Sequence, residues 1–136
     1  MSSAEYLDLD DLLALAAALL GDPPPVRDVG LLGSAAARPQ TSAFGEDAYP
    51  DLWTKAGALL QSIVKNHALV DGNKRLGWLA TGTFLELNGV EVTHVPNDDV
   101  YDFVIGVAAG KDEVPDIAAQ LEQLVTQRRT RRPRRA

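Results

Sequence analysis

The sequence has no cysteine among its 136 residues, so it forms no disulfide and offers no thiolate ligand to a metal. Its longest apolar run, LLALAAALL at 12–20, is far shorter than the roughly 20 residues that a bilayer-spanning helix needs. Acidic residues precede that run, where a secretory signal would carry basic ones. A phosphate loop of the G-x-x-x-x-G-K-[ST] kind is absent as well. We therefore expect a soluble, cytoplasmic protein with no membrane partner.

Charge is spread unevenly along the chain and divides it into two parts. Residues 1–126 carry all 19 acidic residues and seven of the 13 Lys and Arg, a net charge of −12. With 46% hydrophobic residues overall, this part is expected to form one domain with its own core. The last ten residues, QRRTRRPRRA at 127–136, hold the other six Arg. This tail is expected to be solvated and disordered, and a tether to nucleic acid or to an acidic partner is the alternative.

Apolar residues recur at helical spacing nearly everywhere in 1–126, which predicts an all-α fold. The spacing and the capping residues predict six helices: Asp8 to Gly21, Asp28 to Ala37, Asp51 through Val64, a stripe from Leu76 to Leu87, Asn97 to Gly110, and a stripe from Ile117 to Val125. The segment RPQTSAFGEDAYP at 38–50 is rich in turn formers and predicts a loop or short hairpin. We interpret VEVTHV at 90–95 as a short extended connection, and its His94 as a surface residue without a catalytic role.

The stretch KNHALVDGNKRLGW at 65–78 gathers five ionisable residues around one Asp-Gly-Asn turn. His67 follows Ile63 by four positions and Val64 by three, so it is expected to continue the buried face of its helix. On that interpretation it is a core or helix-terminal histidine. Asp71 and Asn73 would then serve only as N-cap residues of the next helix.

Lys74 and Arg75 are harder to explain structurally. Both fall in the first turn of the following helix, where a cation opposes the helix dipole by about 0.3–1 kcal/mol. Unpaired N–H groups point out of the same helix end, so positive potential converges where an anion could bind. A histidine can accept a proton from an attacking hydroxyl, and a carboxylate four residues later can hold Mg²⁺ beside phosphate oxygens. Together these residues predict a nucleotide-phosphate site with a built-in base.

HALVDGNKR at 67–75 resembles the signature of the Fic/Doc family, H-x-F-x-[DE]-G-N-[GK]-R, and matches six of its fixed positions. The resemblance implies a Fic/Doc-type bundle of about six helices, with the signature between two central helices and a flap at 38–50. It implies that ATP is used, that His67 is the general base and that Asp71 binds Mg²⁺. The ATP phosphates would be bound by the next four residues: Gly72, Asn73, Lys74 and Arg75.

Three positions depart from the usual pattern and indicate a branch of the family. Leu69 replaces Phe, which keeps the loop's anchor apolar. Members that transfer AMP carry Gly at the position of Lys74 and a second Arg at that of Trp78. The latter two differences resemble the Doc branch, the toxins of Phd–Doc toxin–antitoxin pairs, in which ATP presents its γ-phosphate. A long cation in place of Gly would crowd and recharge the phosphate groove, so a change of transferred group is physically reasonable.

The Doc resemblance implies a kinase that phosphorylates a hydroxyl of a translation factor, elongation factor Tu in the Doc case, and so arrests growth. Two alternatives stay open: AMP transfer to a protein hydroxyl, and a non-catalytic binding module. The flap residues Thr41, Ser42 and Phe44 are expected to dock the target, whose extended chain could pair with the flap backbone. An ordinary surface loop is the alternative for this segment.

Control is expected to come from a separate protein. SAFGED at 42–47 matches only part of the family's inhibitory-helix pattern, [ST]-x-x-x-E-[GN], and Trp78 stands where the partner Arg of that helix would be. We therefore expect inhibition in trans by a Phd-like antitoxin. Its binding segment would dock as a helix on apolar surface near the motif, and the charge of −12 suggests that part of it is basic.

Overall fold

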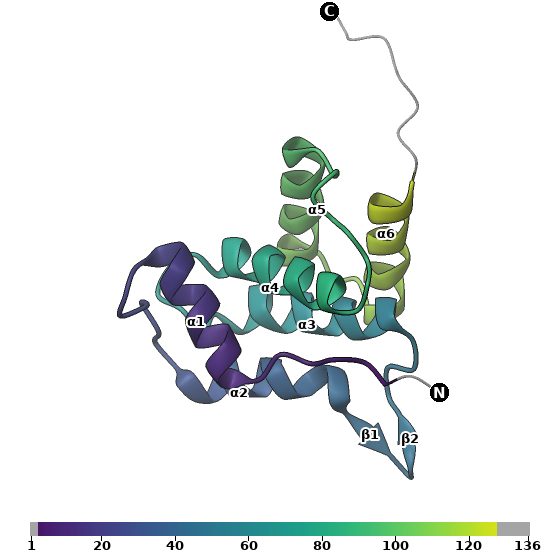
Figure 1. Ribbon diagram of the computed structural model, residues 1–136, viewed down its shortest axis with the longest axis horizontal. Helices are drawn as coiled ribbons and strands as arrows, with labels where there is room; N and C mark the ends of the chain where they lie inside the picture. Colours follow the sequence, from purple (N-terminus) through teal and green to yellow (C-terminus); the bar gives the residue numbers. More distant parts are fainter. Residues whose placement is uncertain (1–2, 128–136) are drawn as a thin grey trace, which may run out of the picture.

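The computed structural model describes residues 3–127, and Figure 1 shows their arrangement. Within this range the chain forms six α-helices, a 3₁₀ turn and one two-stranded hairpin. In chain order they are α1 Leu9–Leu20, α2 Val29–Ala37, η1 Arg38–Gln40, β1 Ser42–Ala43, β2 Glu46–Asp47, α3 Leu52–Asn66, α4 Asn73–Leu87, α5 Asn97–Ala109 and α6 Val114–Thr126. The prediction of an all-α bundle with a short hairpin is confirmed. Apart from Gln127, the Arg-rich tail lies outside the described residues.

Three aspartates start helices where the sequence predicts. The Asp8 carboxylate accepts a hydrogen bond from the Asp11 N–H at 2.8 Å, and the Asp11 carboxylate accepts one from the Asp8 N–H at 2.9 Å. This reciprocal capping box satisfies two backbone donors at the start of α1. Asp51 and Thr54 form the same arrangement at the start of α3, and Asp28 caps α2. Each cap stabilises its helix by about 1 kcal/mol.

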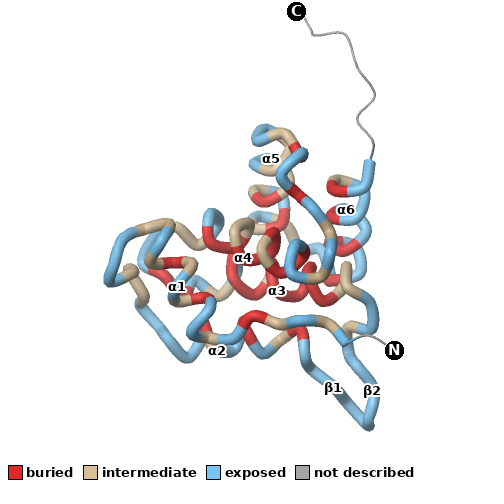
Figure 2. The backbone as a smooth tube through the Cα atoms, viewed as in Figure 1, coloured by how far each residue is buried: buried red, intermediate tan, exposed pale blue. Residues whose placement is uncertain are grey.

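Helices α3 and α4 form the centre of the molecule and run side by side (Figure 1). Every residue of α3 from Lys55 to Leu60 is buried, and Figure 2 shows buried backbone concentrated in this pair. At Gly77 of α4, a Cβ would lie 2.7 Å from the Val64 Cγ1 and 3.1 Å from the Leu60 Cδ1. The two helices therefore approach here more closely than a larger residue would allow. Their packing holds the loop between them, residues 67–72, in place.

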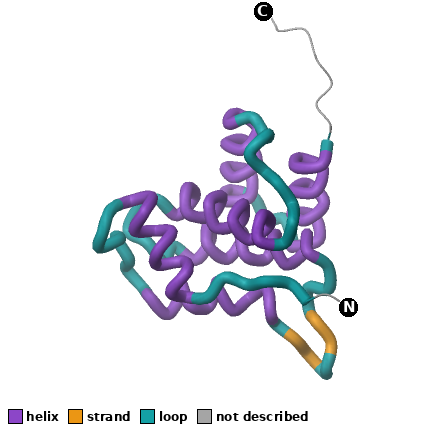
Figure 3. Tube along the Cα trace, viewed as in Figure 1, coloured by secondary structure: helices purple, strands orange, loops and turns teal. Residues whose placement is uncertain are grey.

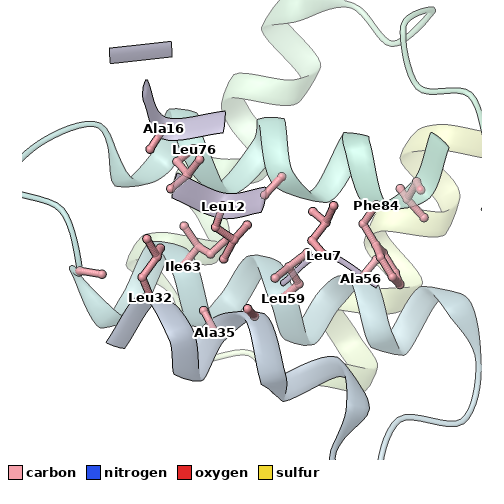
Figure 4. Packing of buried hydrophobic residues seen from close by; sticks show 14 of the residues in the cluster. Leu7, Leu12, Ala16, Leu32, Ala35, Ala56, Leu59, Ile63, Leu76 and Phe84 are labelled. Atoms are coloured by element: carbon pink, nitrogen blue, oxygen red, sulfur yellow. The ribbon is translucent and has the colours of Figure 1, made fainter. Parts of the chain in front are cut away.

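Apolar side chains cover the central pair on both sides. Figure 4 shows side chains from α1, α2, α3 and α4 meeting in one cluster that includes Leu12, Leu32, Leu59, Ile63, Leu76 and Phe84. A second cluster joins the central pair to α5 and α6 through Leu60, Val64, Val104, Val107 and Ile117. Full burial of one such side chain contributes about 1.5–3 kcal/mol. Apolar packing on both sides therefore fixes the orientation of α3 and α4.

The hairpin projects from the helical body and contains the only strands among residues 3–127 (Figures 1 and 3). Its turn residues, Phe44 and Gly45, have φ angles of 54° and 78°, the positive values that a type I′ hairpin turn requires. Phe44 is fully exposed at the tip. Because residues 42–47 are strands and a turn, the partial match to the inhibitory-helix pattern does not form a helix, as expected.

Two details differ from the sequence-based expectations. Residues 90–95 connect α4 to α5 as predicted, but they form a turn at Thr93 and His94 instead of staying extended. A turn closes there through a hydrogen bond from the Val95 N–H to the Val92 carbonyl at 3.1 Å, and both side chains are buried. Helix α5 has Pro96 as its N-cap residue, so Asn97 lies just inside the helix. No helix within residues 3–127 is long and apolar enough to cross a membrane.

Candidate active site

Helix α3 ends at Asn66, and His67 leaves it in the left-handed conformation, with φ 55° and ψ 46°. Glycine is the usual residue at such a helix end, because any other L-residue is destabilised there by about 1–2 kcal/mol. The change of backbone conformation turns the His67 side chain away from the buried stripe of Ile63 and Val64. His67 is exposed and lines a pocket. The expectation that it continues the buried stripe is therefore wrong, whereas its helix-terminal position is confirmed.

Asn73 closes the loop onto the start of α4. Its Oδ1 accepts the Leu69 N–H and its Nδ2 donates to the Leu69 carbonyl, both at 3.0 Å. The Asp71 carboxylate accepts the Gly72 N–H at 2.9 Å. Gly72 is the N-cap residue of α4, with φ 89°, and no side chain caps this helix. The alternative that Asp71 and Asn73 are N-caps is therefore wrong. The positive end of α4 is left open to a ligand.

The proline-rich segment at 23–28 supports the loop from behind. Val26 and Leu69 form an isolated antiparallel bridge. Beside it, the Val70 N–H donates to the Pro25 carbonyl at 2.8 Å. This support could not be predicted from the sequence, because pairing between residues more than 40 positions apart leaves no periodic pattern. Three consecutive prolines, which cannot continue a helix, are the only signal of an extended segment here.

A pocket of about 790 Å³ opens where the loop, the first turns of α4 and α5 meet. All six residues predicted to act in catalysis, metal binding or phosphate binding line it: His67, Asp71, Gly72, Asn73, Lys74 and Arg75. The other walls are mainly apolar and come from α1, the motif loop, α4 and α5: Leu19, Val70, Trp78, Leu79, Asn97, Val100, Tyr101, Val104 and Ile105. The part of the wall that comes from α5 was not predicted, because nothing in the helical pattern of α5 indicates what it packs against. The volume lies in the range of small-ligand sites.

Two cations line this pocket at the start of α4. Lys74 and Arg75 are exposed in the first turn of α4, as predicted, and that turn contains no acidic residue. Within residues 3–127 neither side chain forms an ion pair. Their charges add to that of the uncapped helix end, so an anion bound there would be stabilised by two side chains and by backbone N–H groups.

Asp71 is the carboxylate of the pocket. It is exposed, and its hydrogen bond to the Gly72 N–H holds it beside the positive residues. Mg²⁺ in phosphate-transfer sites is commonly bound through one or two carboxylates together with substrate phosphates and water. One oriented carboxylate next to an uncapped helix N-terminus fits this mode of binding.

The structure does not bring the predicted docking residues to the pocket. The hairpin lies at the N-terminal end of α3 (Figure 1), whereas the pocket is lined by His67, which directly follows the C-terminal end of α3. The 15 residues of α3 between them span roughly 22 Å at 1.5 Å per residue. Thr41, Ser42 and Phe44 are exposed and lie outside the pocket. The base of the hairpin is held by Lys55, which is 5% exposed and forms an ion pair with Asp47 at 3.4 Å.

Comparison with protein-family models gives a match to the family described as Fic/DOC over residues 6–85, which include α1 to α3, the loop and most of α4. The chain belongs to the Fic/Doc family. It is 49% identical to a protein named Toxin Doc from Mycolicibacterium smegmatis over 118 residues, 86% of this chain and 91% of that protein. It is 28% identical to Protein kinase doc of Escherichia phage P1 over 122 residues, 88% and 94% of the two chains. Both relatives support the Doc branch, as Lys74 and Trp78 indicate.

Proposed function

We propose that this protein is a Doc-like toxin that transfers the γ-phosphoryl group of ATP to a hydroxyl of a translation factor, elongation factor Tu, and so arrests growth in the cytoplasm. The observation that carries the proposal is the convergence of His67, Asp71, Lys74 and Arg75 on one pocket at the open end of α4. The name of the phage P1 relative, a protein kinase, favours phosphoryl over AMP transfer. The name of the mycobacterial relative, a toxin, favours growth arrest.

The first turn of α4 holds the phosphates of the substrate. Backbone N–H groups after Gly72 point at the phosphate oxygens, and Lys74 and Arg75 stabilise the charge on the transferring group. Mg²⁺ held by Asp71 would neutralise part of the phosphate charge when bound. These groups are positioned before the substrate arrives, so little reorganisation is needed during transfer.

His67 acts on the incoming hydroxyl. The imidazole accepts the hydroxyl proton while the hydroxyl oxygen forms a bond to the γ-phosphorus. The bond between that phosphorus and the bridging β–γ oxygen breaks, and ADP leaves with the electron pair. His67 is exposed at the pocket, so a hydroxyl on another protein can reach it. General base catalysis of this kind contributes about 10²–10⁴ to the rate.

The flap remains the proposed docking surface for the target. A target that reaches both His67 and the hairpin spans roughly 22 Å along α3, a distance compatible with an interface of about 800 Å² per partner. Phe44 at the hairpin tip supplies an exposed aromatic anchor. Thr41 and Ser42 lie beside the hairpin edge, where an extended segment of the target can pair.

A Phd-like antitoxin is the proposed source of inhibition. The pocket wall presents Val70 and Tyr101, which are 68% and 66% exposed, to a docking helix. The charge of −12 on residues 1–126 favours a partly basic partner segment. Expression of this chain alone in its host should then arrest growth, and His67→Ala should relieve the arrest. Healthy growth with abundant, folded wild-type protein and no partner present contradicts this part of the proposal.

ATP labelled separately at the α- and the γ-phosphate distinguishes phosphoryl transfer from AMP transfer. The protein is incubated with a cell lysate, or with purified elongation factor Tu, and with ATP labelled at the α- or the γ-phosphate. We expect γ-label on the factor. The α-label on protein would indicate AMP transfer instead, and no label from either would favour a binding module.

The two histidines of the chain supply a matched pair of variants for this assay. His67→Ala should abolish transfer and leave ATP binding nearly intact, because the base acts on the hydroxyl and not on the phosphates. His94→Ala is the control, since His94 lies outside the pocket, with its Nε2 2.7 Å from the Val125 carbonyl. Equal labelling by His67→Ala and wild type would remove His67 from the mechanism.

A further inference from the structure

Arg27 reaches the end of α3 from a segment 40 residues earlier in the chain. Its Nη2 donates a hydrogen bond to the His67 carbonyl at 2.6 Å. Its backbone N–H donates to the next carbonyl, that of Ala68, at 2.7 Å, and the Asp28 N–H donates to the same oxygen at 3.0 Å. Arg27 therefore binds two consecutive carbonyls directly at the residue proposed as the base. The mechanism described above assigns it no role.

The first of these bonds acts on the dihedral angle that defines the conformation of His67. Rotation about ψ of His67 swings its carbonyl oxygen, so a donor fixed on that oxygen restricts ψ near its value of 46°. Strained conformations of non-glycine residues persist only where the surroundings determine them. If His67 relaxed to right-handed helix, α3 would continue by one residue. The imidazole would then return toward the buried stripe of Ile63 and Val64.

We propose that Arg27 is a positioning residue for His67: its guanidinium holds the left-handed turn that directs the imidazole into the pocket. The alternative is a purely structural role, because a cation near the C-terminal carbonyls of a helix is favourable in any protein. The inference rests on the proposed function only in taking His67 as the base. The direction of the ring can be measured without any reaction.

Histidine-ring NMR provides that measurement, because the chain has two histidines and His94→Ala assigns their signals. Arg27→Met keeps a long side chain and removes every side-chain donor, while the backbone N–H to the Ala68 carbonyl remains. Arg27→Lys keeps a positive charge and one donor group. We expect Arg27→Met to shift and broaden the His67 ring signals and to leave those of His94 in place, and Arg27→Lys to restore the His67 signals in part. Arg27→Gln, which keeps a neutral donor, replaces Arg27→Met if that variant does not fold.

Kinetics give a second readout. Arg27→Met should lower the turnover number for transfer by about ten- to a hundredfold, since small displacements of a reacting group have effects of this size. Its affinity for ATP should stay within about twofold, because the phosphate-binding groups of α4 are untouched.

Lys65→Met is the matched control. Lys65 likewise binds carbonyls near the end of a helix, those of Ala108 and Gly110, at 3.4 and 2.5 Å. The Lys65→Met variant should leave the His67 ring signals and the turnover number near those of the wild type.

Unchanged His67 signals and unchanged turnover in Arg27→Met would overturn the inference. A lower melting temperature with unchanged signals and turnover would also overturn it, because Arg27 would then be only a helix cap. Shifted His67 signals in a protein whose wild type transfers no phosphate would support the positioning role of Arg27 and refute the proposed kinase activity. The two proposals can thus fail separately.

Discussion

Replacement of Asn73 by alanine should loosen the active-site loop and destabilise the fold at the same time. The Asn73 side chain makes two hydrogen bonds to the backbone of Leu69, both at 3.0 Å. Leu69 is 1% exposed, so its N–H and carbonyl cannot readily turn to water when the amide is lost. At about 1 kcal/mol net for each bond, the free energy of unfolding should fall by about 2 kcal/mol. For a domain of this size that lowers the melting temperature by about 6–10 °C.

Asn88→Ala is the matched control for Asn73→Ala. The Asn88 side chain binds the backbone of Glu5 at 2.8 and 2.9 Å and the Phe84 carbonyl at 2.8 Å, so its loss should be of similar size. It lies at the C-terminal end of α4, away from the pocket. Both variants should unfold earlier in urea or on heating. Only Asn73→Ala should also speed hydrogen exchange at the Leu69 amide and slow transfer, measured where both variants are folded.

Two results would refute this reasoning. A wild-type melting temperature for Asn73→Ala would show that the two bonds do not stabilise the fold. Equal transfer rates of Asn73→Ala and Asn88→Ala, at a temperature where both are folded, would show that the Asn73 bonds do not position the loop.

The remaining predictions concern the metal, the flap and the core. Asp71→Ala should weaken Mg²⁺-dependent ATP binding in calorimetric titration, and unchanged affinity contradicts the metal role. Because Asp71 caps no helix, the same variant should change the unfolding free energy by less than about 0.5 kcal/mol. Exchange of 41–46 for Gly and Ser should abolish target modification and preserve ATP binding, and modification at the wild-type rate refutes docking there. Thr81→Val should raise the free energy of unfolding in urea by about 1 kcal/mol, because within residues 3–127 the buried Thr81 hydroxyl has no hydrogen-bond partner. A lower free energy of unfolding for Thr81→Val contradicts this prediction.

Local sequence determined the helices and the chemistry of the site. Capping by Asp8 and Asp51 depends on bonds over three residues, and the apolar stripes depend on spacing over one or two turns. Such short-range interactions are visible in a single sequence. The residues of the motif are likewise adjacent in the chain, so their convergence on one helix end could be predicted. For the same reason Lys74 and Arg75 were placed correctly in the first turn of α4.

Tertiary structure decided where the site faces and what surrounds it. The periodicity of α3 placed His67 on the buried face, and contacts with the distant segment at 23–28, Arg27 among them, accompany the turn that exposes it. The packing of α5 against α4 supplied a third of the residues that line the pocket, and the length of α3 separated the hairpin from the pocket. Each of these features depends on which surfaces meet after the chain folds. That is set by complementary packing between segments far apart in the sequence, which no local pattern records.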